Sequence, residues 1–161
     1  MTESQQELAE IAQPKVRAIP AERMRRWMQV STAWLALQEP ERLFPAIVTG
    51  FIEVLPTLRA AILWIATPSG LQPAAQAGLA MPALVETQWR QIKLRLGEGV
   101  AGLAWQRETV VQQHGEHSYR ELQGLASSQA QSVFQALSDL LPRSLTITAA
   151  PLRAGNHCVG V

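Results

Sequence analysis

Hydrophobic residues return every three or four positions from residue 21 to residue 38, with polar residues between them. This period predicts an amphipathic helix, because one helical turn takes about 3.6 residues. Pro40 suits the first turn of a second helix, whose apolar positions continue to Leu55. Residues 1–20 contain two prolines and no sustained period, so we expect a flexible leader ahead of the helices.

The pattern changes to that of strands after Pro56. Residues 60–66 form a short apolar run that closes on the turn signal Pro-Ser-Gly, and residues 71–77 return as the second strand of a hairpin. Apolar and charged residues alternate over 92–96, which predicts a strand with one buried face. This order of helices and strands is typical of an α+β fold. Further strands are expected at 109–112, 144–150 and 156–161, with a turn at 151–155. Helices are expected at 82–91, after the glycine-rich run 97–102 and through Trp105, and at 127–141.

The composition fits one domain over residues 21–161. Of the 161 residues, 47% are hydrophobic and 17% charged, and the formal net charge is +1, so we expect neither nucleic-acid binding nor contact with a membrane surface. The first residues are polar and acidic, unlike a secretory signal. The longest apolar run, residues 60–66, is far shorter than the ~20 residues that span a membrane. We therefore expect a cytoplasmic location.

The rarest residue types exclude several kinds of site. The chain has one aspartate, Asp139, and one cysteine, Cys158, which excludes paired aspartates for magnesium, an intrachain disulfide and multi-cysteine metal sites. Neither of its two lysines follows a glycine, which excludes a phosphate-binding P-loop. Cys158 fits a small residue of the sheet, because its basic neighbour, His157, points to the opposite face of a strand. We expect no catalytic centre and no metal site.

Several segments together resemble the GAF family of sensory domains. They are AAILWIA with its turn, AQAGL after the second strand, LRLGEGVAGLAWQ, and SLTITAAPLRAGNHCVGV at the end. The resemblance covers about residues 21–161. It implies an antiparallel sheet with the N-terminal helices on one face and a pocket-covering helix and loop segment on the other. The family usually completes its last strand and adds a C-terminal helix, so both are expected to be incomplete at Val161.

The ligand classes of the family can be compared with this sequence residue by residue. The resemblance implies no cyclic-nucleotide site, because the Asn-Lys…Phe…Asp-Glu motif of that class is absent. It implies no covalent bilin, since neither the leader nor residues 115–124 carry a cysteine. It also implies no methionine-sulfoxide reductase, which relays disulfides through several cysteines. Haem held by His114 or His117 stays open as an alternative.

A small-molecule pocket is expected beneath residues 114–141. Aromatic walls with a few polar groups are typical of such pockets, although core packing is the commoner fate of a tryptophan in a strand or short helix. In the last long strand, Leu145, Ile147 and Ala149 suit the face packed by the helices, which would turn the hydroxyl groups of the alternate residues toward the pocket. The pocket candidates are Trp64, Trp105, His114, His117, Tyr119, Ser144, Thr146 and Thr148.

Large apolar groups gather on one face of the first helix, which favours a homodimer through this helix. Tryptophan is a common anchor of protein interfaces, and the resemblance implies that paired helices at the domain ends join two protomers. The opposite interpretation is that the same face is covered by its own sheet and second helix. The interface candidates are Met24, Trp27, Met28, Ser31, Trp34 and Leu35.

These expectations combine into one functional hypothesis and two alternatives. We expect a regulatory GAF domain of a bacterial signalling protein, such as a sensor kinase, a cyclase or a transcription regulator. Such a domain binds an unidentified small molecule or a partner and passes a conformational signal to an output domain. The alternatives are a ligand-free dimerisation and scaffolding module, and a haem-based gas or redox sensor.

Overall fold

The structure is a computed structural model that describes residues 20–115, 127–138 and 146–161. Four strands form one antiparallel sheet in the order β2-β1-β6-β5, and β3 pairs with β4 in a second, two-stranded antiparallel sheet. The end of the chain pairs with the middle of β1, because Trp64 and Val161 exchange backbone hydrogen bonds of 2.8 and 2.9 Å. The strands are β1 (Ala61–Thr67), β2 (Gly70–Ala77), β3 (Val111–His114), β4 (Thr146–Ala149), β5 (Leu152–Ala154) and β6 (His157–Gly160).

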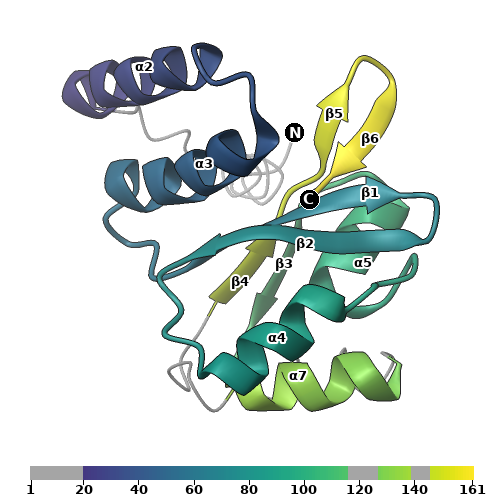
Figure 1. The fold of residues 1–161 in the computed structure, drawn as a ribbon. Helices are drawn as coiled ribbons and strands as arrows, with labels where there is room; N and C mark the ends of the chain where they lie inside the picture. Colours follow the sequence, from purple (N-terminus) through teal and green to yellow (C-terminus); the bar gives the residue numbers. More distant parts are fainter. Residues whose placement is uncertain (1–19, 116–126, 139–145) are drawn as a thin grey trace, which may run out of the picture.

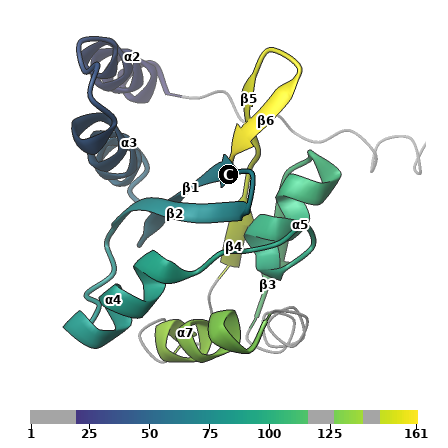
Figure 2. The same cartoon turned by 45° about the vertical axis from the view of Figure 1, so that its right-hand side comes forward.

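Helices cover both faces of the larger sheet (Figure 1). The two N-terminal helices lie on one side of β1 and β2, and the other three described helices lie on the opposite side. Figure 2 shows the hairpin β5–β6 projecting beyond the rest of the sheet. The expected α+β architecture, with N-terminal helices on one face, is confirmed. The helices are α2 (Ala21–Leu35), α3 (Pro40–Val54), α4 (Ala83–Gln91), α5 (Gly99–Arg107) and α7 (Ser128–Ser138).

Strand β1 is apolar from Ala61 to Ala66 because both of its faces are covered. Leu63 is 4% exposed and packs with Val48 of α3 and Ala75 of β2. Its neighbour Trp64, 5% exposed, points to the other face and packs with α4, α5 and α7. Successive side chains of a strand point to opposite faces, so a strand between two layers of helices needs apolar residues at every position. This explains the unbroken apolar run in the sequence.

The hairpin of α2 and α3 depends on a close approach at Gly50. A Cβ atom at this position would lie 2.5 Å from Cγ1 of Val30 and 2.8 Å from Cζ2 of Trp34. The Trp34 indole also donates a hydrogen bond of 3.2 Å to the carbonyl of Ala46. Gly50 is unfavourable inside a helix by itself, but its lack of a side chain lets α2 pack against α3.

The glycine-rich segment 97–102 forms a tight turn that leads into the first residues of α5. The backbone N–H of Gly97, whose φ is 82°, donates to the carbonyl of Gly102 at 2.9 Å. The Glu98 carboxylate accepts a hydrogen bond of 2.9 Å from the backbone N–H of Arg95. A Cβ on Gly102 would lie 2.5 Å from the Arg95 carbonyl oxygen, so this motif has a clear structural role.

Two segments differ from the sequence prediction. Residues 92–96 are not a regular strand: Leu94 forms one isolated bridge with Leu71, after which the chain turns into the glycine-rich segment. The alternation is correct for Ile92 and Leu94, which are buried, whereas Leu96 is 56% exposed. The expected turn at 151–155 contains the short strand β5, because its residues pair with β6 across Gly155 and Asn156.

We predict that Gly50→Ala destabilises the domain, although alanine favours an isolated helix by about 1 kcal/mol. The new methyl group would overlap Val30 and Trp34, and overpacking typically costs about 1–3 kcal/mol. Urea unfolding should therefore show a net loss of roughly 1 kcal/mol. The matched control is Thr49→Ala at the neighbouring exposed position, which should be neutral or slightly stabilising. Equal or greater stability of Gly50→Ala would contradict the close packing.

Candidate functional site

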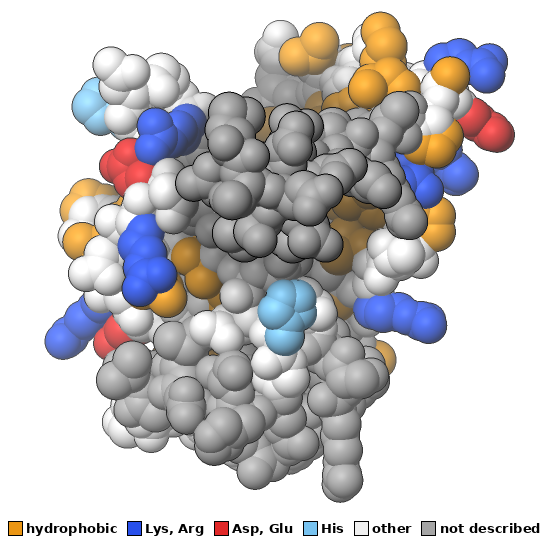
Figure 3. All heavy atoms as spheres, turned by 180° about the vertical axis from the view of Figure 1, so that it is seen from behind, with side chains coloured by type: hydrophobic (Ala, Val, Ile, Leu, Met, Phe, Trp, Pro, Cys, Tyr) orange, Lys and Arg blue, Asp and Glu red, His pale blue; other side chains and the backbone are white. Residues whose placement is uncertain are grey.

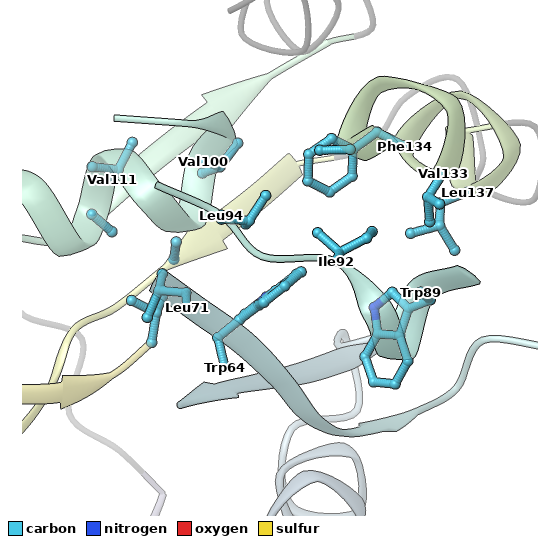
Figure 4. Packing of buried hydrophobic residues seen from close by; sticks show 14 residues of the cluster. Trp64, Leu71, Trp89, Ile92, Leu94, Val100, Val111, Val133, Phe134 and Leu137 are labelled. Carbon is cyan, nitrogen blue, oxygen red and sulfur yellow. The ribbon is translucent and has the colours of Figure 1, made fainter. Parts of the chain in front are cut away.

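A cluster of buried apolar side chains fills the space between the sheet and helices α4, α5 and α7 (Figure 4). We call it the core cluster. Three of its rings, those of Trp64, Trp89 and Phe134, come from the strand β1 and the helices α4 and α7 respectively. Its buried members are Trp64, Leu71, Trp89, Ile92, Leu94, Val100, Ala104, Val111, Ala130, Val133, Phe134, Leu137, Ala149 and Val161.

Trp89 carries a polar atom that has no partner in this apolar surrounding. The residue is 2% exposed, and its indole Nε1 is the one buried side-chain nitrogen or oxygen without a hydrogen bond among the described residues. In Figure 4 the nitrogen is on the edge of the ring turned toward Ile92. A buried donor without an acceptor costs about 1–3 kcal/mol. The protein groups around Trp89 therefore leave this buried donor unpaired.

The two tryptophans expected to line a pocket both contact the core cluster. Trp64 is buried and meets Trp89 edge to face, with ring centroids 6.4 Å apart and an interplanar angle of 63°. Trp105, on α5, is half-buried and packs against the cluster. The structure therefore brings both residues to the same side of the sheet. Their role in ligand binding stays a prediction.

The polar candidates on β3 and β4 lie on the opposite face from the core cluster. His114 Nδ1 and Thr146 Oγ1 are 3.0 Å apart, and Gln112 donates to Thr148 Oγ1 at 3.0 Å. All four side chains are exposed, whereas Ile147 packs against the core cluster.

The predicted division of β4 is thus present, with Ile147 and Ala149 on the helix-packed face and the two threonines on the other face, but the helix concerned is α5 and not one of the N-terminal helices. Alternation shows that Thr146 and Thr148 share a face, but it does not show which helices cover the other face. In the structure β4 packs against α5, and α3 covers β1 and β2 instead. The two threonines consequently do not line the core side of the sheet. His117, Tyr119 and Ser144 lie outside the described residues.

The interface candidates on α2 divide into two groups. Trp27 and Trp34 are half-buried, and their rings lie 5.1 and 5.9 Å from that of Phe51 on α3. The second helix therefore covers part of the face that carries these two tryptophans. The remaining candidates form a stripe beside them, which we call the α2 stripe. Its members are Met24, Met28, Ser31 and Leu35.

The α2 stripe carries exposed apolar groups. Met24 is 42% exposed, Met28 61% and Leu35 85%, and Ser31 donates its hydroxyl to the Met28 carbonyl at 3.1 Å. Figure 3 shows hydrophobic side chains beside basic ones at the corner of the molecule formed by α2. An open groove of about 270 Å³ also runs between α2 and α3, lined in part by Ala33, Trp34 and Glu53.

Clusters of metal ligands and membrane-spanning helices are two features that the described residues lack. They contain no group of three or more histidine, cysteine, aspartate or glutamate side chains that could hold a metal ion. Cys158 is half-buried, and its thiol donates to the Gly160 carbonyl at 3.2 Å. Within the same residues, no helix is both long and apolar enough to cross a membrane.

Neither a protein-family model nor a curated protein matches the chain, but solved structures do. A GAF domain of a phosphoenolpyruvate-protein phosphotransferase from Coxiella burnetii aligns with a TM-score of 0.60 at 18% identity, over 86% of this chain and 73% of the other. The GAF domain of an Acinetobacter phosphoenolpyruvate-protein phosphotransferase gives a TM-score of 0.59 at 12% identity, over 88% and 75% of the two chains. The chain has the GAF fold.

A third similar structure is that of an enzyme. The free methionine-R-sulfoxide reductase from Neisseria meningitidis, solved with its substrate, aligns with a TM-score of 0.53 at 14% identity, over 92% of this chain and 76% of the reductase. These identities show the fold alone. The sequence resemblance to the GAF family is thereby confirmed at the level of architecture.

Sequence reasoning missed Trp89 as a candidate. The residue is visible in the sequence as part of a weak helical period with Val85, which predicts a core position and nothing more. Its indole N–H is unpaired because the surrounding residues, which come from distant parts of the chain, provide no hydrogen-bond acceptor. No local pattern of the sequence contains that information.

Proposed function

We propose that this GAF domain is a regulatory module that binds a small molecule between its sheet and the layer formed by α4 and α7. The observation that carries the proposal is the unpartnered indole Nε1 of Trp89, buried beside the ring of Trp64. Binding there would change the packing of α4 and α7 against the sheet. If α4 and α7 can pack against the sheet in two ways that bind the ligand with different affinity, the ligand favours one of them. An attached domain can then respond to that change in packing.

The related structures support a binding role for this fold. Two of them are GAF domains of phosphotransferases, and the third is a reductase that was solved with its substrate bound. For the present chain we propose regulation rather than catalysis. Its one cysteine, Cys158, donates a hydrogen bond within β6 and has no second cysteine with which to form a disulfide relay.

A thermal-shift screen against a defined panel of metabolites tests this proposal. The panel should contain amino acids, nucleosides, sugars, carboxylic acids and neutral aromatic compounds. A compound at about ten times its Kd stabilises the folded protein by about 1.4 kcal/mol, which raises Tm by roughly 3–6 °C in a domain of this size. We expect at least one compound to do so.

The variant Trp89→Phe should lose most of that shift, because it removes the donor, whereas Trp27→Phe should keep it. Trp27 lies in the contact between α2 and α3 and makes a suitable control of the same chemistry. A panel without any stabilising compound, or a hit that stabilises both variants equally, would contradict a ligand site at Trp89.

We also propose that two copies of the domain associate through the α2 stripe. Its four residues follow each other at spacings of four, three and four positions, which places them on one face of a helix as in a two-stranded coiled coil. The stripe lies next to the face that Trp27 and Trp34 turn toward α3. A second copy of α2 is the occupant that matches this spacing, because the same stripe can then serve both partners.

Sedimentation of a matched pair of variants tests the dimer. At tens of micromolar the unmutated domain should be dimeric, and Met28→Glu should be monomeric because it would bury a charge in the apolar seam. Gln29→Glu adds the same charge at the next position, on another face of the helix, and should remain dimeric. A monomeric unmutated domain, or a Met28→Glu variant that stays dimeric, would rule out this interface.

A further inference from the structure

The chemistry around Trp89 narrows the class of ligand that the proposed site would accept. The indole is a donor only, so its partner must present a hydrogen-bond acceptor. A water molecule fits poorly here, because a buried water needs two to four polar partners. The neighbours of Trp89 in the core cluster are the apolar side chains of Trp64, Ile92, Val133 and Leu137.

Charge imposes a second restriction on the ligand. Among the described residues, no lysine, arginine, histidine, aspartate or glutamate side chain is buried. A carboxylate or phosphate brought there would lose its hydration without gaining a cation, and an ammonium group would lack an anion. The part of the ligand that reaches Trp89 must therefore be neutral.

The shape of the surroundings imposes a third restriction. Trp64 and Trp89 meet edge to face, and Phe134 of α7 belongs to the same cluster. Aromatic edges and faces stack favourably against other flat rings. Helix α7 packs on α4, so a ligand would reach Trp89 only where these two helices separate.

We propose that the ligand is a small, uncharged, flat apolar molecule with one strong acceptor, such as a carbonyl oxygen, that accepts a hydrogen bond from Trp89 Nε1. This inference rests on the ligand site proposed above and specifies what occupies it. It is independent of the dimer. It also assigns Trp89 a specificity role, because the indole distinguishes a carbonyl compound from a hydrocarbon of the same shape.

Three probes of nearly equal shape test the proposal. Acetophenone carries a neutral carbonyl, α-methylstyrene replaces that oxygen by a methylene group, and benzoate replaces the acetyl group by a carboxylate. Binding is followed in ¹H–¹⁵N spectra through the five tryptophan indole signals, with that of Trp89 assigned by its loss in Trp89→Phe. We expect acetophenone to move the Trp89 signal downfield and to bind about tenfold more tightly than α-methylstyrene. Benzoate should bind more weakly than acetophenone.

The variant Trp89→Phe should abolish the preference for acetophenone while still binding both neutral probes. Equal affinity of the unmutated domain for acetophenone and α-methylstyrene would overturn the acceptor inference, and so would tighter binding of benzoate. Either of these two results would leave the proposed ligand site at Trp89 intact and would overturn only the inferred class of ligand. Failure of all three probes to bind also overturns the inference, and the proposed function fails with it only if the metabolite panel is empty as well.

Discussion

The burial of strand β1 on both faces is the constraint on which the rest of the structure depends. Leu63 and Trp64 are adjacent in sequence, yet one packs under α3 and the other under α4, α5 and α7. Neither layer of helices could be removed without exposing a row of large apolar side chains, and each such side chain contributes roughly 1.5–3 kcal/mol when buried. The end of the chain adds to this strand, because Val161 pairs with Trp64.

The same constraint places the candidate site. A strand that is covered on both faces separates two sets of neighbours that share no side chains. The α3 side is small and closed by Val48, Leu63 and Ala75. The other side contains the large rings and the unpartnered Trp89 donor. It is the side on which a change in packing can be coupled to binding, since its helices α4 and α7 lie at the outside of the fold.

Local patterns in the sequence predicted most of the fold. The helical periods of α2 and α3, the hairpin of β1 and β2 and the glycine-rich segment before α5 all appear close to the expected positions, because they depend on neighbours a few residues away. Residues 92–96 were misjudged because alternation is also compatible with an extended segment that makes a single bridge. The hairpin strand β5 was missed because it has only three residues and all three are exposed.

The candidate site was less predictable because its properties depend on contacts between distant residues. The alternation of apolar and polar residues correctly placed Thr146 and Thr148 on the same face of β4. It could not show that α5 packs on the opposite face, so that both threonines point away from the core cluster. The apolar face of α2 was correctly found, yet only the position of Phe51 shows that Trp27 and Trp34 belong to the contact with α3.

The central claim is that Trp89 keeps an unsatisfied donor until a ligand arrives, and a high-resolution crystal structure of the ligand-free domain tests it most directly. The claim predicts that no nitrogen or oxygen of the protein lies within about 3.5 Å of Trp89 Nε1. It also predicts no ordered water there with further protein partners. A backbone carbonyl or a well-coordinated water accepting from this indole would contradict the claim, because the donor would then be satisfied by the fold itself.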